Sequence, residues 1–259
     1  MAIFDTHTIA GIVGVALAGG LIGLDRTAAG QFMISQPIVA GPIAGWLLGD
    51  AAAGLVIGAV LELIWVLDMP VGTFVPADAT IGAVSATAIA VLAGNGAARL
   101  DVIGFSIILT TLIVPATMKA EGVVRTYNAR FAGGLVFAAG DDPGRKLSRA
   151  HLSGLAIFFM KSFILYLIFV PAGLAAAALF EQLPPPVHSA SALFVKLLPL
   201  LGAAMVVRRL SIRIMDRFFL SGFVFAAVAA LFFQAPAGII IFFVALAGYA
   251  GVRYGEHWM

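Results

Sequence analysis

Long apolar runs, separated by short polar or proline-containing breaks, make up most of this chain. A helix needs about 20 apolar residues to cross the hydrocarbon core of a bilayer. We therefore predict membrane-spanning helices over these runs: 8–24, 51–67, 79–94, 102–118, 152–180, 190–207, 218–234 and 236–252. The pattern predicts an all-α fold, a polytopic transmembrane helical bundle in which residues 1–259 form a single integral membrane domain.

Two stretches between the runs are too short or too broken to span a bilayer. Residues 37–49 begin with a proline and contain Pro42, and residues 68–80 contain Pro70 and Pro76. Irregular backbone is tolerated at membrane depth only where protein or a watery cavity satisfies its amide groups. We predict re-entrant or broken helices near both stretches. Two ordinary loops outside the membrane are the alternative that the local sequence leaves open.

Composition agrees with a membrane protein. Apolar residues make up 62% of the chain, charged residues 11%, and the mean hydropathy is +1.08. Soluble proteins carry about 25% charged residues, so this chain has too little polar surface to coat a soluble globule. No Lys or Arg precedes the first apolar run. We therefore expect residues 8–24 to be a retained span rather than a cleaved signal peptide.

Several kinds of chemistry are absent from the sequence. The chain contains no cysteine, which excludes disulfides, thiolate metal sites and cysteine nucleophiles. Its four histidines stand at the edges of apolar runs, and none pairs with another at metal-ligand spacing. We expect no bound metal and no cofactor. No nucleic-acid motif is present, and the net charge of +2 largely reflects the topology signal described next.

The distribution of cations predicts the orientation in the membrane. Ten of the 15 Lys and Arg residues fall in two connections: Lys119, Arg125, Arg130, Arg145, Lys146 and Arg149 in the first, and Arg208, Arg209, Arg213 and Arg217 in the second. Loops rich in Lys and Arg stay on the cytoplasmic side. We therefore predict that both connections are cytoplasmic and that the C-terminus, with Arg253, is cytoplasmic as well.

The first basic connection, 119–151, mixes apolar and basic residues in the stretch VVRTYNARFAGGLVFAAG, as an interfacial helix does. A docking surface for a soluble partner and a solvated loop that only fixes topology are the alternatives. Lys161 and Lys196 lie in or near apolar runs, and we expect their long side chains to reach a membrane interface.

Acidic residues interrupt the apolar pattern in AVLELIWVLDMPVGTFVPADAT, which contains Glu62, Asp68 and Asp78. Just upstream, two sets of glycines are spaced by four, one from Gly41 and the other ending at Glu62. Small residues at this spacing allow helices to approach closely, so we expect two close helix contacts. A charge at a helix centre costs about 2.5–3.5 kcal/mol on insertion scales. We therefore predict that Glu62 faces protein or water; a purely structural pair with an arginine is the alternative.

Carboxylates near amide and aromatic groups are suited to binding a sugar. Their oxygens accept from several hydroxyls, and an indole covers the apolar face of the ring. Glu62, Asp78, the amide of Gln31 and the indole of Trp65, three residues after Glu62, form the candidate set. Trp65 serves equally well as a packing residue. The same acids would suit a proton- or cation-coupled secondary transporter or, less well, an intramembrane hydrolase.

The combination of these motifs resembles a known family. DRTAAGQFMISQPIVAGPIAGWLLGD, followed by GLVIGAVLELIW and PVGTFVPADAT, is similar to the IIC membrane subunit of the mannose and sorbose family of bacterial phosphotransferase systems. The match is close over residues 25–80 and looser at LPLLGAAM, residues 198–205. The chain departs from the family pattern at two places. It has VPAD where the family has VPPD or VAPD, and Asp68 where glycine is common. These departures leave the identity of the sugar open.

The resemblance implies a channel for a hexose or related sugar in the bacterial inner membrane, with re-entrant hairpins. It implies a second membrane subunit, IID, cytoplasmic IIA and IIB proteins that carry the phosphoryl group, and an assembly of several copies. By the family pattern, Gln31, Glu62 and Asp78 are site residues. The chain itself has no P-loop pattern and no cysteine, so we expect a non-catalytic subunit that is not an enzyme.

Overall fold

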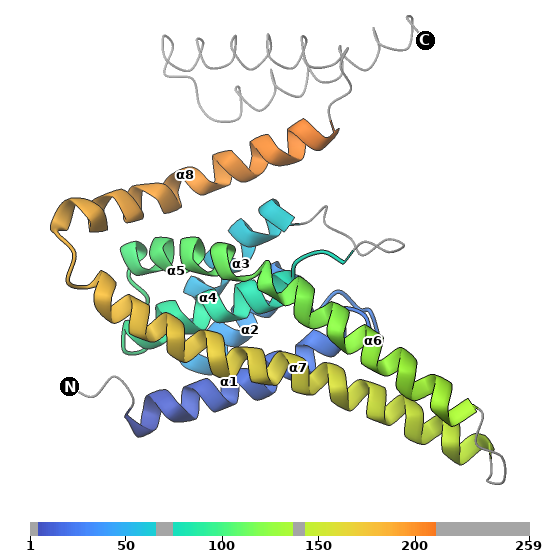
Figure 1. Cartoon of the computed structure of the whole chain (residues 1–259). Coiled ribbons are helices and arrows are strands. Elements are labelled where there is room, and N and C mark those ends of the chain that lie inside the picture. The colour runs from blue at the N-terminus through green and yellow to red at the C-terminus, as the bar shows by residue number, and fades with distance from the viewer. Residues whose placement is uncertain (1–4, 66–74, 137–142, 211–259) are drawn as a thin grey trace, which may run out of the picture. The chain divides into compact units, whose positions relative to one another are not determined.

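The computed structural model describes residues 5–65, 75–136 and 143–210. Within these residues the chain forms α-helices and no β-strand, as the apolar pattern predicts (Figure 1). The helices are α1 (Thr6–Leu24), α2 (Pro37–Leu48), α3 (Ala51–Trp65), α4 (Ala79–Ala93), α5 (Leu100–Ile113), α6 (Ala116–Val136), α7 (Pro143–Phe180) and α8 (Pro185–Leu210). The chain divides into two compact units, Met1–Ala203 and Ala204–Met259. Only the end of α8 is described in the second unit.

Helix lengths separate spanning helices from shorter ones. Among the described residues, α1 and the segment Leu147–Phe180 of α7 are long and apolar enough to cross a membrane. Helices α5 and α6 meet both conditions only together, across a bend of 45°, because α5 has 14 residues and α6, with 21, is too polar by itself. The bend lies at Pro115, which has no backbone N–H to donate within the helix and whose ring clashes with the carbonyl four residues before it.

Two predicted spans are shorter than expected. The runs 51–67 and 79–94 do form helices over nearly those residues, α3 and α4, but each has 15 residues. That is about 22 Å, less than a hydrocarbon core of about 30 Å. The prediction that 79–94 spans the bilayer alone is therefore wrong, whereas the run 51–67 is described only up to Trp65. The predicted spans 218–234 and 236–252, and the region around Asp68, lie outside the described residues.

Helix α4 lies at the centre of the first unit. Its residues from Thr80 to Val91 are all buried, and it packs against α1, α2, α3, α5 and α7. The sequence ATIGAVSATAIAVLA consists mostly of small residues, which let several helices approach one axis. One apolar cluster joins α4 to α3 and α5 through Leu61 and Ile107, and a second joins it to α1 and α7 through Val15 and Tyr166.

Helices α2 and α3 form a short antiparallel hairpin at the stretch predicted to be re-entrant. Gly49, at φ 99°, ends α2 in the left-handed conformation that favours glycine. The two glycine sets face each other in one seam, rather than making the two separate contacts that the spacing suggested. A Cβ on Gly41 would lie 2.5 Å from the backbone oxygen of Gly54, and one on Gly58 would meet the carbonyl of Pro37. Larger residues therefore cannot occupy the seam.

Candidate functional site

The loop between α1 and α2, residues 25–36, is held in shape by one buried carboxylate. Asp25 Oδ1 accepts a hydrogen bond from the Phe32 amide at 2.6 Å, and Oδ2 accepts one from the Ser35 amide at 3.1 Å. Burial alone would raise the pKa of Asp25, but these amide donors outweigh it and hold the pKa below its usual range. The carboxylate is thus ionised and fixes the loop.

The middle of this loop contains the predicted site residue Gln31. Gly30, Gln31 and Met33 have φ angles of 82°, 57° and 66°, in the left-handed region that residues other than glycine seldom adopt. The tight course exposes Gln31 and leaves Phe32 77% exposed. The amide of Gln31 is therefore presented on the outside of the loop, where it can donate and accept.

Glu62 lies on α3 opposite the start of α2. Its Oε2 accepts a hydrogen bond from the Ile38 amide at 3.2 Å. This amide belongs to the first turn of α2, where no partner exists within the helix and where the N-cap residue, Gln36, makes no side-chain bond. Glu62 is half-buried and turns toward protein, as predicted. Its second oxygen has no partner among the described residues, and no arginine pairs with it there.

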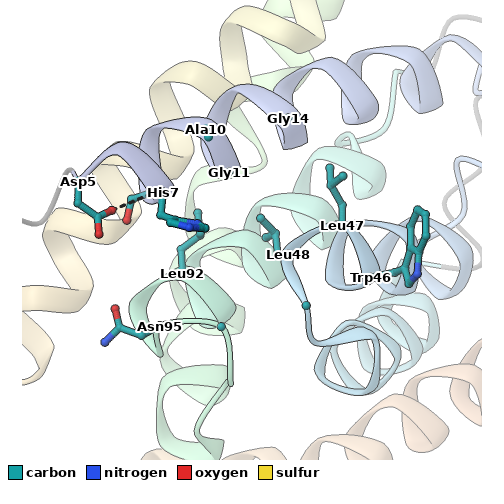
Figure 2. A pocket seen from close by; sticks show the side chains of 13 residues that line it. Asp5, His7, Ala10, Gly11, Gly14, Trp46, Leu47, Leu48, Leu92 and Asn95 are labelled. Carbon is teal, nitrogen blue, oxygen red and sulfur yellow. Dashed lines mark hydrogen bonds between the residues drawn. The ribbon is translucent and has the colours of Figure 1, made fainter.

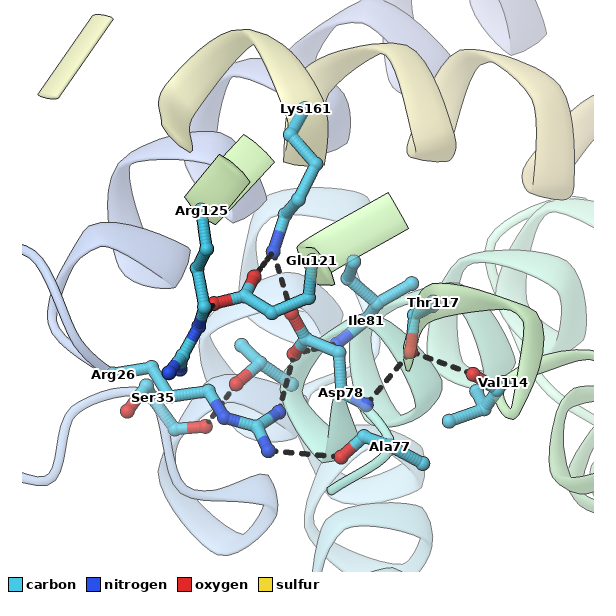
Figure 3. A network of polar contacts seen from close by, with 11 residues as sticks. Arg26, Ser35, Ala77, Asp78, Ile81, Val114, Thr117, Glu121, Arg125 and Lys161 are labelled. Atoms are coloured by element: carbon cyan, nitrogen blue, oxygen red, sulfur yellow. Dashed lines mark hydrogen bonds and ion pairs between the residues drawn. The ribbon is translucent and has the colours of Figure 1, made fainter. Parts of the chain in front are cut away.

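Asp78 belongs to a chain of five alternating charges, of which all but Arg125 are largely buried (Figure 3). Its Oδ1 lies 2.9 Å from Nη1 of Arg26, and its Oδ2 lies 3.0 Å from Nζ of Lys161. Lys161 also lies 2.8 Å from Oε2 of Glu121, and Oε1 of Glu121 accepts from Arg125 at 3.0 Å. The side chains of Asp78 and Lys161 are each only 7% exposed. The three cations and two anions carry a net charge of +1.

The ion chain joins four parts of the first unit. Arg26 follows α1, Asp78 precedes α4, and Lys161 reaches across from α7 toward Glu121 on α6, as Figure 3 shows. Asp78 also caps α4, because its Oδ1 accepts from the Ile81 amide at 3.3 Å. Its own amide donates to Thr117 Oγ1 at 2.8 Å. The start of α4 is therefore bonded to the end of α1 on one side and to α6 and α7 on the other.

The expectation that Lys161 reaches a membrane interface is wrong. A buried cation between two carboxylates is stabilised by them, whereas the sequence rule considers only the lysine and its apolar neighbours. Lys196, by contrast, is exposed. Sequence reasoning also missed Arg26 and Glu121. The sequence sets both apart only as charges beside apolar runs, and it does not show which residues they pair with.

Trp65 takes part in packing. Its six-membered ring lies against α4, where a Cβ on Gly82 would come within 2.9 Å of it. The ring also packs on the apolar cluster that contains Leu61 and Ala86. The structure thus uses Trp65 to fit α3 against α4, which was the alternative to stacking on a sugar.

Hydrogen bonds bring most of the predicted site residues into one region. Thr80 Oγ1 donates to the Ser35 carbonyl at 2.6 Å, which ties the Gln31 loop to α4 beside Asp78. Ser35 lies close in sequence to Ile38, the partner of Glu62. The gap beside the ion chain, however, measures only about 10 Å³, room for a single water. Asp78 is thus enclosed, while Gln31 and Glu62 are accessible.

A larger cavity lies at the ends of α1, α2 and α4 that are farther from the ion chain (Figure 2). It has a volume of about 930 Å³ and is lined by the start of α1 and the ends of α2 and α4. Asp5, His7 and Asn95 stand at one side of it and the exposed indole of Trp46 at the other. None of the predicted site residues lines this cavity.

Comparisons with known proteins agree on one family. The family described as "PTS system sorbose-specific iic component" matches residues 9–249. The mannose-specific EIIC component of Escherichia coli K12 is 27% identical over 205 residues, which cover 76% of this chain and 73% of that protein. The sorbose-specific EIIC component of Klebsiella pneumoniae is 26% identical over 196 residues, 74% of this chain and 71% of that protein. The fructose permease IIC component of Bacillus subtilis is 26% identical over 195 residues, which cover 74% of this chain and 70% of that protein.

Two solved structures share the fold. One, titled only as the structure of a membrane protein, is 25% identical, with a TM-score of 0.66, and the match covers 98% of this chain and 96% of that chain. The second is the mannose transporter ManYZ in complex with microcin E492, which is 24% identical with a TM-score of 0.55 and the same coverage. The helical fold described above is therefore that of membrane transport proteins.

Proposed function

Because the chain belongs to the sorbose-specific IIC family of the bacterial phosphotransferase systems (PTS), we propose that it is the sugar-translocating membrane subunit of a mannose- or sorbose-type PTS. It is a multi-pass bacterial membrane protein that binds a hexose or related sugar within the inner membrane. Its partners are the membrane subunit IID, in a hetero-oligomer, and the cytoplasmic IIA and IIB proteins. These supply the phosphoryl group, and the chain itself is non-catalytic.

The position and bonding of the Glu62 carboxylate support a sugar site in this chain. One oxygen of its carboxylate is fixed by the Ile38 amide, so the side chain is already oriented, and the other, which has no partner among the described residues, can accept from a sugar hydroxyl. Gln31 presents an amide from the adjoining loop. Glu62 and Gln31 are therefore the direct ligands of the proposal. Hydrogen bonds to a charged acceptor each contribute about 1.5–3 kcal/mol, enough to hold a small polar ligand.

Asp78 has a different part in the proposed site. Both of its oxygens are engaged by cations within the protein, so it contributes by positioning the Gln31 loop and the start of α4. The same contacts argue against a cation-coupled carrier, because Asp78 has no carboxylate oxygen left for a transported ion. A hydrolase would need Glu62 and Asp78 as a pair, yet within the described residues each is bonded to different partners.

The proposed orientation of the protein in the membrane follows from the basic residues on α6 and at the start of α7, which the positive-inside rule assigns to the cytoplasm. Helix α1 is antiparallel to α7, because Gly19 packs on Tyr166 and Gly23 on Ser162. The Gln31 loop then lies toward the cytoplasm and the cavity of about 930 Å³ toward the outside. Asp5, His7 and Trp46 suit the outer entrance for a sugar, and the C-terminus is cytoplasmic.

The proposal is tested with Glu62→Gln in protein purified with its IID partner. The amide oxygen of glutamine can still accept from Ile38, so the fold is retained, but the charge is lost. We expect sugar affinity, measured by isothermal titration over a panel of hexoses, amino sugars and ketoses, to fall by about tenfold to about 150-fold. Glu181→Gln, an exposed acid at the far end of α7, is the matched control. Equal sugar binding by Glu62→Gln and the parent would overturn the site.

A further inference from the structure

Helix α7 is much longer than a bilayer requires. Its 38 residues extend about 57 Å, whereas the hydrocarbon core is about 30 Å thick. The part from Lys161 to Phe180 alone extends about 28 Å along this helix, close to the thickness of the core. The part before Lys161 is therefore additional length, and α6 runs antiparallel beside it (Figure 1). We refer to α6 with residues Pro143–Met160 of α7 as the basic hairpin.

The basic hairpin carries more cations than anions. Its two arms contain six Lys and Arg residues and one acid, Glu121, and the connection between them contains Asp141 and Asp142, so residues 116–160 have a net charge of +3. Glu121 is buried and neutralised by Arg125 and Lys161. Arg130 and Arg149 are exposed. A phosphoryl group carries a charge of about −2, so a surface of this kind attracts a protein that bears one and speeds its association.

The basic hairpin also exposes apolar side chains suited to a protein contact. Tyr127 is 58% exposed and Leu147 is 74% exposed. Beside Leu147 lies a cavity of about 300 Å³, formed by α6, α7 and Ala28 of the loop that contains Gln31. It is lined by Asn128, whose Oδ1 is buried without a hydrogen-bond partner. The cavity has room for one side chain of a partner.

We propose that the basic hairpin is the docking surface for the phosphorylated cytoplasmic IIB protein. This rests on the proposed function, which supplies the partner. Basic residues together with an exposed aromatic are the composition typical of protein interfaces. Docking at this place also reaches the site by two routes. Ala28 belongs to the Gln31 loop, and Arg125 begins the ion chain that includes Asp78.

The experiment measures binding of purified IIB protein from the same genome to inside-out vesicles that contain this chain and IID. Arg130→Glu combined with Arg149→Glu should weaken binding at least tenfold and reduce its dependence on salt. Sugar affinity should stay at the parental value. Gln182→Glu, which adds a negative charge at the opposite end of α7, is the control and should leave IIB binding unchanged.

The outcomes separate the two proposals. If IIB binds the charge-reversed chain as tightly as the parent, the docking surface is wrong and the sugar-binding function stands. If Leu147→Cys is labelled only by a lipid-soluble reagent, the hairpin lies in the bilayer and the docking surface is wrong as well. If the parent itself neither binds IIB nor yields phosphorylated sugar with IIA and IIB, both proposals fail.

Discussion

Replacing Lys161 by methionine removes the central cation of the ion chain while keeping the length of the side chain. In the parent, the ammonium group lies 3.0 Å from Asp78 and 2.8 Å from Glu121. In Lys161→Met, both carboxylates stay buried, and each keeps only one arginine. Removing one partner from a buried ion pair costs about 3–5 kcal/mol, because the remaining charge is left uncompensated.

That cost is large against a total stability of about 5–15 kcal/mol. At about 2–4 °C for each kcal/mol in a chain of this size, we expect the midpoint of thermal unfolding to fall by about 6–20 °C. The measurement is a thermal melt of detergent-purified protein, followed by the loss of monodisperse protein. Lys196→Met is the matched control, because Lys196 is exposed, and it should change stability by less than about 0.5 kcal/mol.

A second substitution tests whether the cost comes from the uncompensated acids. Adding Glu121→Gln to Lys161→Met removes one of them, so the double variant should be more stable than the sum of the single changes by about 0.5–3 kcal/mol. If Lys161→Met melts within 2 °C of the parent, at about the same temperature as Lys196→Met, the ion chain does not stabilise the bundle and the reasoning fails.

Three further predictions concern other parts of the molecule. Asp25→Asn should lower the free energy of unfolding by about 1.5–3 kcal/mol at neutral pH, because the charged acceptor of two amides is gone. The folded-state pKa of Asp25 is lowered, so the stabilisation by its carboxylate is present above the unfolded pKa of about 3.9 and is lost as the pH falls through the folded-state pKa. Melts should therefore show the difference at pH 7 and a smaller one at pH 3; a difference that grows on acidification would contradict this. Gly54→Leu should abolish monodisperse protein in size-exclusion chromatography, whereas exposed Leu55→Ala should not. Cysteines at Arg149 and Gln182 should react with a membrane-impermeant thiol reagent from opposite sides, the first from the cytoplasm; labelling from one side only would discard the topology.

The apolar pattern predicts the helices well, because period and length are properties of the local sequence. The proline at residue 37 and the glycines at four-residue spacing predict a short helix and close helix contacts, and α2 and its seam with α3 agree with both. The pairing of α2 with α3 was not predicted, because residues 51–67 were expected to span the membrane. The same spacing could not show that both glycine sets meet in one seam. That depends on the turn at Gly49, whose geometry is fixed only when the two helices pack.

The ion chain could not be predicted from the sequence. Its members come from the end of α1, the start of α4, α6 and α7, and they meet only in the folded bundle. Hydropathy assigns a lysine near an apolar run to an interface, since a single sequence carries no sign of its distant partners. Glu62 was predictable as a residue that faces protein, because an acid in an apolar helix is costly in lipid whatever its partner. Its bond to Ile38 was not predictable.

The seam between α2 and α3 has a consequence for how the protein enters the membrane. Helix α2 has 12 residues and the described part of α3 has 15, so neither of these stretches is long enough to be integrated alone. Their contacts are between residues close in sequence, and such contacts form early in folding because little chain entropy is lost in closing the loop. Gly41, Gly54 and Gly58 carry no side chain that must be ordered. The two helices are therefore expected to be inserted by the translocation machinery as one prefolded hairpin, before the helices that later surround it are synthesised.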